Sequence, residues 1–108
     1  MRRVYINATK HGNPIFLVTG MGKLRIPNWH RMEVRRRRDN DEFGWGDCGR
    51  KSRATAYSIL RATVGRETAA QLQDIFLQEY VSQLKPDRGF RLSLNRLLHI
   101  AGDMSARS

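Results

Sequence analysis

Two kinds of hydrophobic periodicity divide this chain. Up to about residue 42, apolar residues form short runs or alternate with polar ones, as they do in β-strands. Three such runs, 4–6, 15–19 and 24–26, are separated by turn residues, and Pro27 ends the last of them. From residue 50 the apolar positions recur every three or four residues, which is typical of helices. We therefore predict an α+β fold, with a small antiparallel sheet of three or four strands followed by two or three packed helices.

The segment 28–34 fits either a fourth strand or an irregular stretch. The first predicted helix is capped by Ser52 and ended by Gly65. The second runs from residue 67 or 68 to Leu84 and cannot extend past Pro86. Its apolar stripe is expected to cover one face of the sheet and consists of Leu72, Ile75, Phe76, Tyr80 and Leu84.

The last predicted helix begins at Leu94, with Ser93 as its cap, and ends near Ala101 because Gly102 follows. Leu92 and Leu97 have the spacing of a hydrophobic staple. We expect four side chains of this helix to face inward and the last six residues to fray. The inward-facing residues are Leu94, Leu97, Leu98 and Ala101.

A glycine-rich turn with two large aromatic residues, 43–49, joins the two halves. Its three glycines permit unusual backbone angles, while Phe43 and Trp45 can bury much apolar surface. We predict that both aromatic residues anchor this turn in the core and that Cys48 is a small buried hydrophobe. The chain is then one domain over 1–108, with a β-rich basic part (1–42), this turn, a helical part (50–102) and a frayed tail (103–108).

Composition limits the chemistry available. The single cysteine cannot form an intramolecular disulfide, and the three histidines lack the spacing of a metal site, so we expect neither a metal nor another cofactor. No apolar run is long enough for a signal peptide core or a membrane span. These features predict a cytoplasmic protein without a membrane partner.

Charge is distributed unevenly along the chain. The 108 residues carry a formal net charge of +10. Lys and Arg minus Asp and Glu gives 10 − 2 = +8 for residues 1–39, 5 − 3 = +2 for 40–66 and 5 − 5 = 0 for 67–108. A positive potential over the first part would attract nucleic acid, an anionic membrane or an acidic protein surface. A DNA-reading helix-turn-helix is disfavoured because the most helical region is neutral.

Four consecutive arginines, Arg35, Arg36, Arg37 and Arg38, form the most basic segment. Four like charges cannot be buried together, so the run lies on a loop or the flank of a hairpin. The acidic residues of 39–42 follow at once, and a merely solvated loop is one interpretation. A contact surface is the other, because guanidinium groups bind phosphate in a bidentate manner.

Other cations and aromatic residues flank this run. Trp29 and Arg31 precede it, and aromatic residues interleaved with arginine are typical of single-stranded nucleic-acid binding. Arg50, Lys51 and Arg53 stand in the first helical turn, where positive charge opposes the helix dipole. They either extend into water or attract an anionic ligand to that end of the helix.

No arrangement of residues indicates a catalytic site, and we do not predict an enzyme. The possible acid and base residues lack the spacing of a known chemistry. His30, between Trp29 and Arg31, is the one histidine in a setting suited to RNA cleavage, while His99 faces away from the apolar stripe of its helix. A small basic ribonuclease is therefore a third possibility behind two binding functions.

The turn Phe43-x-Trp45-Gly46-x-x-Gly49 resembles the Phe-x-Trp-Gly-x-Gly-Gly turn of an uncharacterised small-protein family found in bacteria, phages and plasmids. The likeness covers about residues 43–100, although Cys48 replaces a glycine and Lys51-Ser52 stand in for a Gly-Pro-like helix entry. The resemblance implies a β-rich front, a helical back half and a mobile-element setting, and no catalytic residues. The other matching residues are Ala56, Ile59, Leu60, Ala70, Leu72, Gln73, Phe76, Val81, Leu84, Phe90, Leu92, Ser93 and Ile100.

These observations predict a nucleic-acid-binding accessory or regulatory protein of a mobile element, which contacts phosphates through its arginine-rich loop. The alternative is an anti-CRISPR-like inhibitor of host defence that binds an acidic protein surface or a nucleoprotein. The apolar stripe of the second helix also allows a homodimer. The predicted contact residues are Trp29, Arg31, Arg35, Arg36, Arg37, Arg38, Arg50, Lys51 and Arg53.

Overall fold

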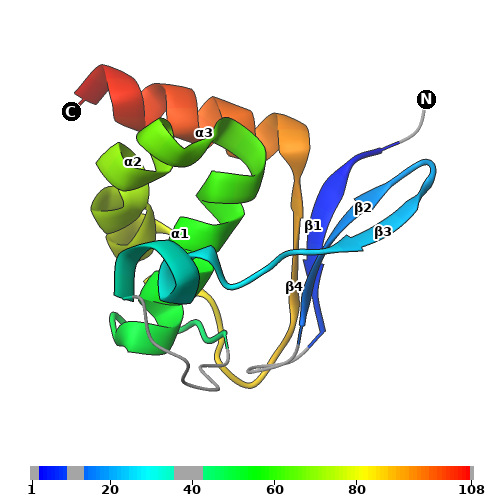
Figure 1. Ribbon diagram of the computed structural model, residues 1–108, viewed down its shortest axis with the longest axis horizontal. Helices are drawn as coiled ribbons and strands as arrows, with labels where there is room; N and C mark the ends of the chain where they lie inside the picture. The colour runs from blue at the N-terminus through cyan, green and yellow to red at the C-terminus, as the bar shows by residue number, and fades with distance from the viewer. Residues whose placement is uncertain (1–2, 10–13, 36–42, 108) are drawn as a thin grey trace.

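The predicted α+β fold is confirmed by a computed structural model, which describes residues 3–9, 14–35 and 43–107 (Figure 1). A four-stranded antiparallel sheet stands on one side and the helices gather on the other. The elements in chain order are β1 (Tyr5–Ala8), β2 (Ile15–Thr19), β3 (Gly22–Arg25), the π-helix η1 (His30–Arg35), α1 (Arg50–Val64), α2 (Arg66–Glu79), the 3-10 helix η2 (Val81–Gln83), β4 (Phe90–Ser93) and α3 (Leu94–Arg107).

The sheet has the strand order β3-β2-β1-β4, so the first strand of the chain lies inside it. On one side Ile6 pairs with Leu17 of β2, and on the other side with Leu92 of β4. The first three strands form the expected meander. The fourth strand is β4, which joins β1 from the far end of the chain.

The segment 28–34, for which we considered a fourth strand, is largely helical. Asn28 begins this turn: its Oδ1 accepts a hydrogen bond from the backbone N–H of Arg31 at 2.9 Å, and its carbonyl accepts one from Met32. An Asn side chain that satisfies a free N–H in this way favours a helix start over an extended strand. His30 then packs inward, 4% exposed, against α1.

Two expectations about helix ends and one about packing are wrong. Ser52 does not cap α1, which begins two residues earlier after Gly49; Ser52 is buried and donates to Asp47 instead. α3 continues through Gly102 to Arg107, since Met104 extends the buried stripe of Leu97 and Ala101 by one more turn. On this helix Leu98 is 45% exposed, whereas we expected it to face inward.

The stripe of α2 also packs elsewhere than expected. α2 lies against α1 and α3, on the side of α1 that faces away from the sheet (Figure 1). Leu72 and Phe76 are fully buried there, and the helix ends at Glu79 before η2 begins. The stripe is thus core, as its spacing indicates, but it covers helices instead of the sheet.

The turn at 43–49 is ordered and packed, and Phe43 and Trp45 are core residues as predicted. The Trp45 ring is fully buried and its Nε1–H donates to the carbonyls of Lys85 (3.1 Å) and Arg88 (2.7 Å). Gly46, with φ +92°, lies so close to Pro86 that a Cβ would come within 2.7 Å of its ring. Cys48 is exposed, and our prediction of a buried thiol is wrong because this end of the turn faces solvent.

Candidate functional site

The first turn of α1 carries two of the predicted contact residues, Arg50 and Lys51, and both are exposed. A carboxylate already occupies this helix end. Asp47 Oδ1 accepts from the backbone N–H of Gly49 at 2.9 Å and from Ser52 Oγ at 2.7 Å. The negative charge that an anionic ligand would bring to this helix end is thus supplied in part by the chain itself.

Arg53, also predicted as a contact residue, forms an ion pair with Asp74 of α2. Both side chains are substantially exposed, so this pair contributes little to stability. It does fix the guanidinium of Arg53 against α2. A phosphate would have to compete with Asp74 for this arginine.

Trp29 and Arg31 flank the buried His30 at the start of η1. Trp29 is partly buried against the core, and the guanidinium of Arg61 lies over its ring, with Cζ 4.5 Å from the ring centroid. Arg31 is also partly buried. The Trp29 ring therefore helps to attach η1 to α1, and one of its faces is already covered by a cation.

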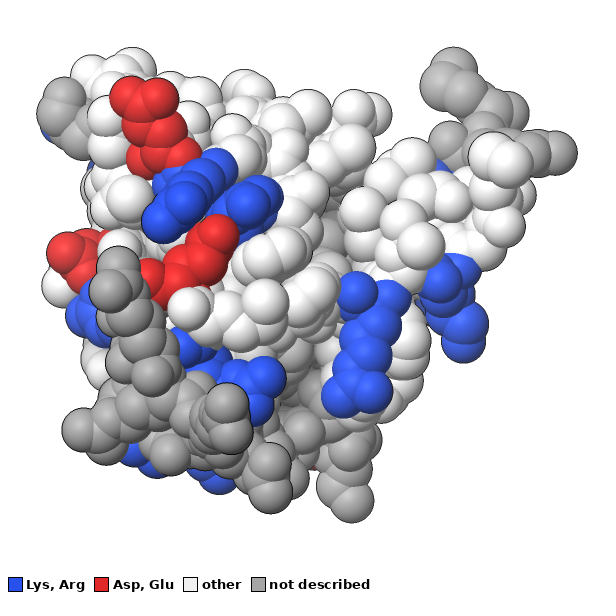
Figure 2. Space-filling view, in the orientation of Figure 1, with Lys and Arg blue, Asp and Glu red and all other residues white. Residues whose placement is uncertain are grey.

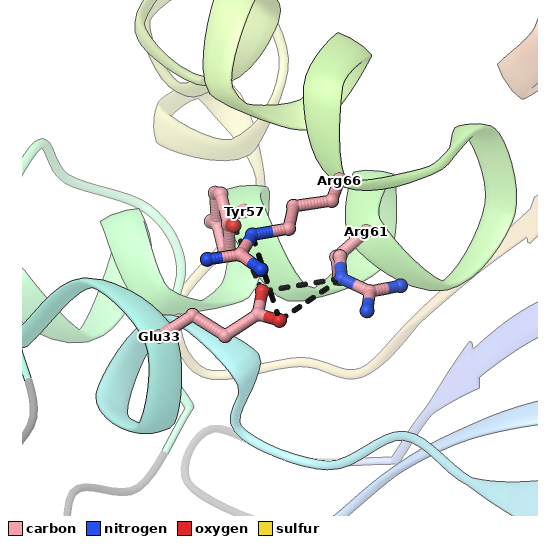
Figure 3. Close-up of polar contacts among 4 residues, drawn as sticks. All are labelled: Glu33, Tyr57, Arg61 and Arg66. Atoms are coloured by element: carbon pink, nitrogen blue, oxygen red, sulfur yellow. Dashed lines mark hydrogen bonds and ion pairs between the residues drawn. The ribbon is translucent and has the colours of Figure 1, made fainter.

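The carboxylate of Glu33 contacts three side chains from α1 and α2 (Figure 3). Its Oε1 accepts from the hydroxyl of Tyr57 at 2.9 Å and from Arg61 Nε at 3.1 Å, and Arg66 Nε lies 3.9 Å from Oε2. Burial alone would raise the pKa of Glu33, but the hydrogen bonds from Arg61 and Tyr57 and the charges of Arg61 and Arg66 outweigh it and lower this pKa. Burial and the hydrogen bond to Glu33 raise the pKa of Tyr57.

The contacts of Glu33 hold η1 on α1 and α2, and the arginine run begins at the last residue of η1. Arg35 is the last residue of η1, and no side-chain position is described for it. Arg36, Arg37 and Arg38 lie outside the described residues, so their predicted role stays a prediction. Glu33 was not among the contact residues that we predicted. Its role depends on three side chains of α1 and α2 that are distant from it in the sequence.

The described contact residues do not form one patch. Trp29 contacts Arg61, near the C-terminal end of α1, whereas Arg50 and Lys51 lie in its first turn. Eleven residues of α-helix separate Arg50 from Arg61, about 16 Å along the axis at 1.5 Å per residue. A ligand that used both groups would have to span this distance.

A second basic surface, absent from our sequence-based candidates, lies on the sheet. Residues that pair directly across antiparallel strands point to the same face. The face opposite the core carries the rows Lys23–Val18–Tyr5–Ser93 and Arg25–Phe16–Asn7–Arg91, which we call the outer face. Ile6 and Ala8, which alternate with Tyr5 and Asn7 along β1, point to the other face and are buried, and the described helices lie on that side (Figure 1).

Cations and aromatic rings are paired on the outer face. Lys23 Nζ lies 5.3 Å from the ring centroid of Phe16, and Arg91 Cζ lies 4.8 Å from that of Tyr5. Neither ring packs against the hydrophobic core cluster. The position of Arg91 beside Tyr5 depends on the pairing of β4 with β1, which no local pattern shows.

Charged residues of opposite sign meet only on the helical side of the described structure. Each acidic residue that forms an ion pair there has an arginine partner: Glu33 with Arg61 and Arg66, Asp74 with Arg53, and Glu79 and Asp103 with Arg107. Figure 2 shows red and blue side by side over the helices, and blue without red over the sheet. Among the described residues, Lys23, Arg25 and Arg91 have no ion-pair partner.

The two histidines considered as candidate bases or surface residues differ in exposure. His30, the base of the ribonuclease hypothesis, is buried with its ring edge against Tyr57, and His99 is exposed on α3 as expected. Within the described ranges, no three His, Cys, Asp or Glu side chains are grouped to hold a metal ion. None of the helices described is long and apolar enough to cross a membrane.

Comparison with known proteins gives one match. The model of a family of unknown function, DUF6166, matches residues 7–102. This range extends beyond the 43–100 of the resemblance and includes β2 and β3. No curated protein and no solved structure matched the chain.

Proposed function

Because this chain belongs to DUF6166, a family of unknown function, its activity must be inferred from its own surface, and we propose that it is a small basic nucleic-acid-binding protein. It would act as an accessory or regulatory factor of a plasmid or phage. Phosphate contacts would supply most of the affinity, with little sequence preference.

The observation that carries this proposal is the separation of charge. Acidic residues of the helices form ion pairs with Arg53, Arg61, Arg66 and Arg107, so much of the positive charge in the helical half is compensated internally. The cations of the sheet have no such partners among the described residues. A surface whose cations lack internal counterions attracts a polyanion most strongly.

The arginine run supplies a second group of cations. The run begins at Arg35, the last residue of η1, and residues 36–38 follow in the sequence. The ion pair of Glu33 with Arg61 holds η1 on α1. Guanidinium groups bind phosphate oxygens in pairs, which gives a short run of arginines a strong grip on a nucleic-acid backbone. We expect this run to supply phosphate contacts.

The test is fluorescence anisotropy with labelled duplex DNA, single-stranded DNA and single-stranded RNA, between about 50 and 200 mM salt. We expect the protein to bind nucleic acid, and the logarithm of its affinity to fall linearly with the logarithm of the salt concentration. The double variant Arg36→Glu/Arg37→Glu should weaken binding by roughly tenfold or more and make the salt slope shallower. Binding of none of the three probes at the lowest salt would refute the proposal.

A matched control separates local contact from net charge. Lys85→Glu/Arg88→Glu changes the net charge by the same amount in an exposed loop of the neutral half. The backbone carbonyls of both residues, which hold Trp45, are kept. An equal loss of affinity in both double variants would show that overall charge, and not the arginine run, determines binding.

One observation favours the second candidate, an anti-CRISPR-like inhibitor that docks on an acidic protein or nucleoprotein. Met21 is 95% and Leu24 63% exposed, and both belong to the β2–β3 hairpin that also carries Lys23 and Arg25. Exposed apolar residues beside cations are typical of protein contacts. Leu24→Ser should leave affinity for bare nucleic acid unchanged, but would weaken capture of a host nucleoprotein complex if this candidate holds.

A further inference from the structure

We infer that the outer face of the sheet is a binding site for single-stranded nucleic acid, with bases stacked on Tyr5 and Phe16 and phosphates bound by Lys23, Arg25 and Arg91. This inference rests on the proposed function and assigns it a site and a form of nucleic acid. The site includes none of the contact residues predicted from the sequence.

The two rings have suitable positions for adjacent bases. Tyr5 is opposite Val18, and Phe16 is opposite Asn7, so the rings are diagonal neighbours on β1 and β2. Diagonal neighbours have Cβ atoms about 7–8 Å apart, which leaves room for one base on each ring. Sheet faces with two such aromatic residues can stack two or three unpaired bases. The amide of Asn7, between the rings, can donate to and accept from a base edge.

The cations over the rings do not block the site. A cation–π contact at an exposed position contributes a factor of about 2 to 5 to an equilibrium constant, whereas a base stacked on an aromatic ring contributes about 5 to 150. A base can therefore displace Lys23 from Phe16. The released ammonium group then lies beside the base, where it can contact the adjoining phosphate. The planar guanidinium of Arg91 can instead stay in place and stack on a base itself.

The chemistry of this face favours a single strand over a duplex. In a duplex the base faces are stacked on one another, and a protein reaches only phosphates, sugars and groove edges. Rings on a flat sheet face gain nothing from such a ligand. A single strand offers an unpaired base and a phosphate at each nucleotide, which matches the alternation of ring and cation on the outer face.

The same composition favours nucleic acid over a membrane or an acidic protein. Both of these would satisfy the three cations, but neither carries a flat π-system beside each negative charge, as every nucleotide does. The described strands β1 to β4 carry no Asp or Glu on either face, so nothing in them would repel a polyanion laid across the sheet. The inference therefore depends on the rings, and the experiment tests them separately from the charges.

The experiment compares anisotropy with labelled oligo-dT, oligo-U and a duplex, each about 15 nucleotides long. Tyr5→Leu/Phe16→Leu keeps apolar side chains and removes the π-faces. It should weaken single-strand binding by roughly tenfold or more and leave the salt slope unchanged, because no phosphate contact is lost. Tyr5→Phe keeps the ring and should bind as the wild type does.

The charge variant is Lys23→Gln/Arg25→Gln/Arg91→Gln. Loss of three phosphate contacts should make the logarithmic salt slope of single-strand binding shallower by about 2, at about 0.7 per contact. The matched control, Lys85→Gln/Arg88→Gln/Arg96→Gln, removes the same charge from exposed positions away from the outer face and should change the slope by much less. Equal slopes in the two triple variants would overturn the assignment of the site.

Other outcomes distinguish the inference from the proposed function. If the wild type binds no probe, both fail. If it binds nucleic acid, but the ring variant binds as tightly as the wild type, the sheet site is wrong and the proposed function stands. Amide chemical shifts of the wild type provide a test without variants: oligo-dT or oligo-U should perturb β1, β2 and Arg91, and shifts confined to η1 and α1 would overturn the inference.

Discussion

Glu33 shows how one residue combines charge, packing and position. Its carboxylate accepts hydrogen bonds from Tyr57 and Arg61 and lies near Arg66, so it joins η1 to α1 and to the start of α2. It also offsets part of the positive charge beside Trp29, whose ring Arg61 covers. Loss of this carboxylate would weaken the attachment of η1 to the helices. It would also leave Arg61 and Arg66 close together without their acidic partner.

This arrangement predicts a specific pH dependence. The pKa of Glu33 is lowered in the folded state, so its stabilisation is fully present above its ordinary pKa and is lost as pH falls through the lowered value. Glu33→Gln lacks this titration. The difference in free energy of unfolding between the wild type and Glu33→Gln, measured in urea from about pH 7 to pH 3, should therefore shrink as pH falls.

Asp87→Asn is the control for this experiment, because Asp87 is exposed and makes no ion pair with the described residues. Its difference from the wild type should be small at every pH. A Glu33→Gln difference that stays constant over the whole range would contradict the role of the charged hydrogen bonds.

Three glycines provide a second prediction at this scale, because they differ in φ and in surrounding space. Gly46→Ala meets both a positive φ and the Pro86 ring, and should destabilise the protein by about 2 kcal/mol or more. Gly65→Ala meets the positive φ alone and should cost about 1 kcal/mol. Gly102→Ala, within α3 and in open space, should stabilise by about 0.5–1 kcal/mol.

Urea unfolding midpoints of the three variants check this order. The Gly65 variant separates the backbone strain at Gly46 from the clash with Pro86. If Gly46→Ala were no more destabilising than Gly65→Ala, the close packing between the turn at 43–49 and the loop at Pro86 would be disproved.

At the scale of elements, the sheet is covered unevenly. Along the row Leu92–Ile6–Leu17–Leu24 on the core face, the first two side chains are buried, the third is partly buried and the fourth is 63% exposed. The helices therefore cover β4 and β1 but not β3. The far end of the β2–β3 hairpin extends from the body (Figure 1), and both of its faces are accessible there, as the exposure of Met21 and Leu24 shows.

Two neighbouring leucines of α3 can test which face of this helix packs against the core. Leu97 is fully buried and Leu98 is 45% exposed, although they are neighbours of the same type. Leu97→Ala should cost about 2–5 kcal/mol in the free energy of unfolding, and Leu98→Ala only about 0.5 kcal/mol. Thermal or urea unfolding of the pair measures this difference, and similar values for both would mean that α3 packs in another orientation.

At the scale of the whole molecule, local patterns predicted much of the fold. The apolar run at 15–19, the helical spacing of Ile59 and Leu60 and the glycine-aromatic turn each depend on near neighbours, and the structure confirms those elements. What they cannot show is which elements meet. The stripe of α2 was correctly predicted as core, but its partner, α1, is decided by the packing of the entire chain.

For the candidate site residues too, local patterns do not show which distant parts of the chain meet. Exposure of Arg50 and Lys51 follows from local composition, whereas the ion pair between Arg53 and Asp74 joins two helices. The outer face could not be predicted, because it combines Tyr5 with Arg91 across a strand pairing that spans most of the chain. Net charge predicts only that an anionic partner is attracted, and the strand register shows where rings and cations meet.

The pairing of β1 with β4 also has a consequence for synthesis on the ribosome. About 80 residues separate Ala8 from its partner Phe90, so at roughly 5–20 residues per second β1 waits several seconds for the strand that covers its free edge. During that time Ile6 and Ala8 have no α3 or β4 beside them, and the meander presents an unpaired edge that can bind other chains. The nascent protein is therefore most prone to aggregation, and most dependent on chaperones, until its last quarter has been made.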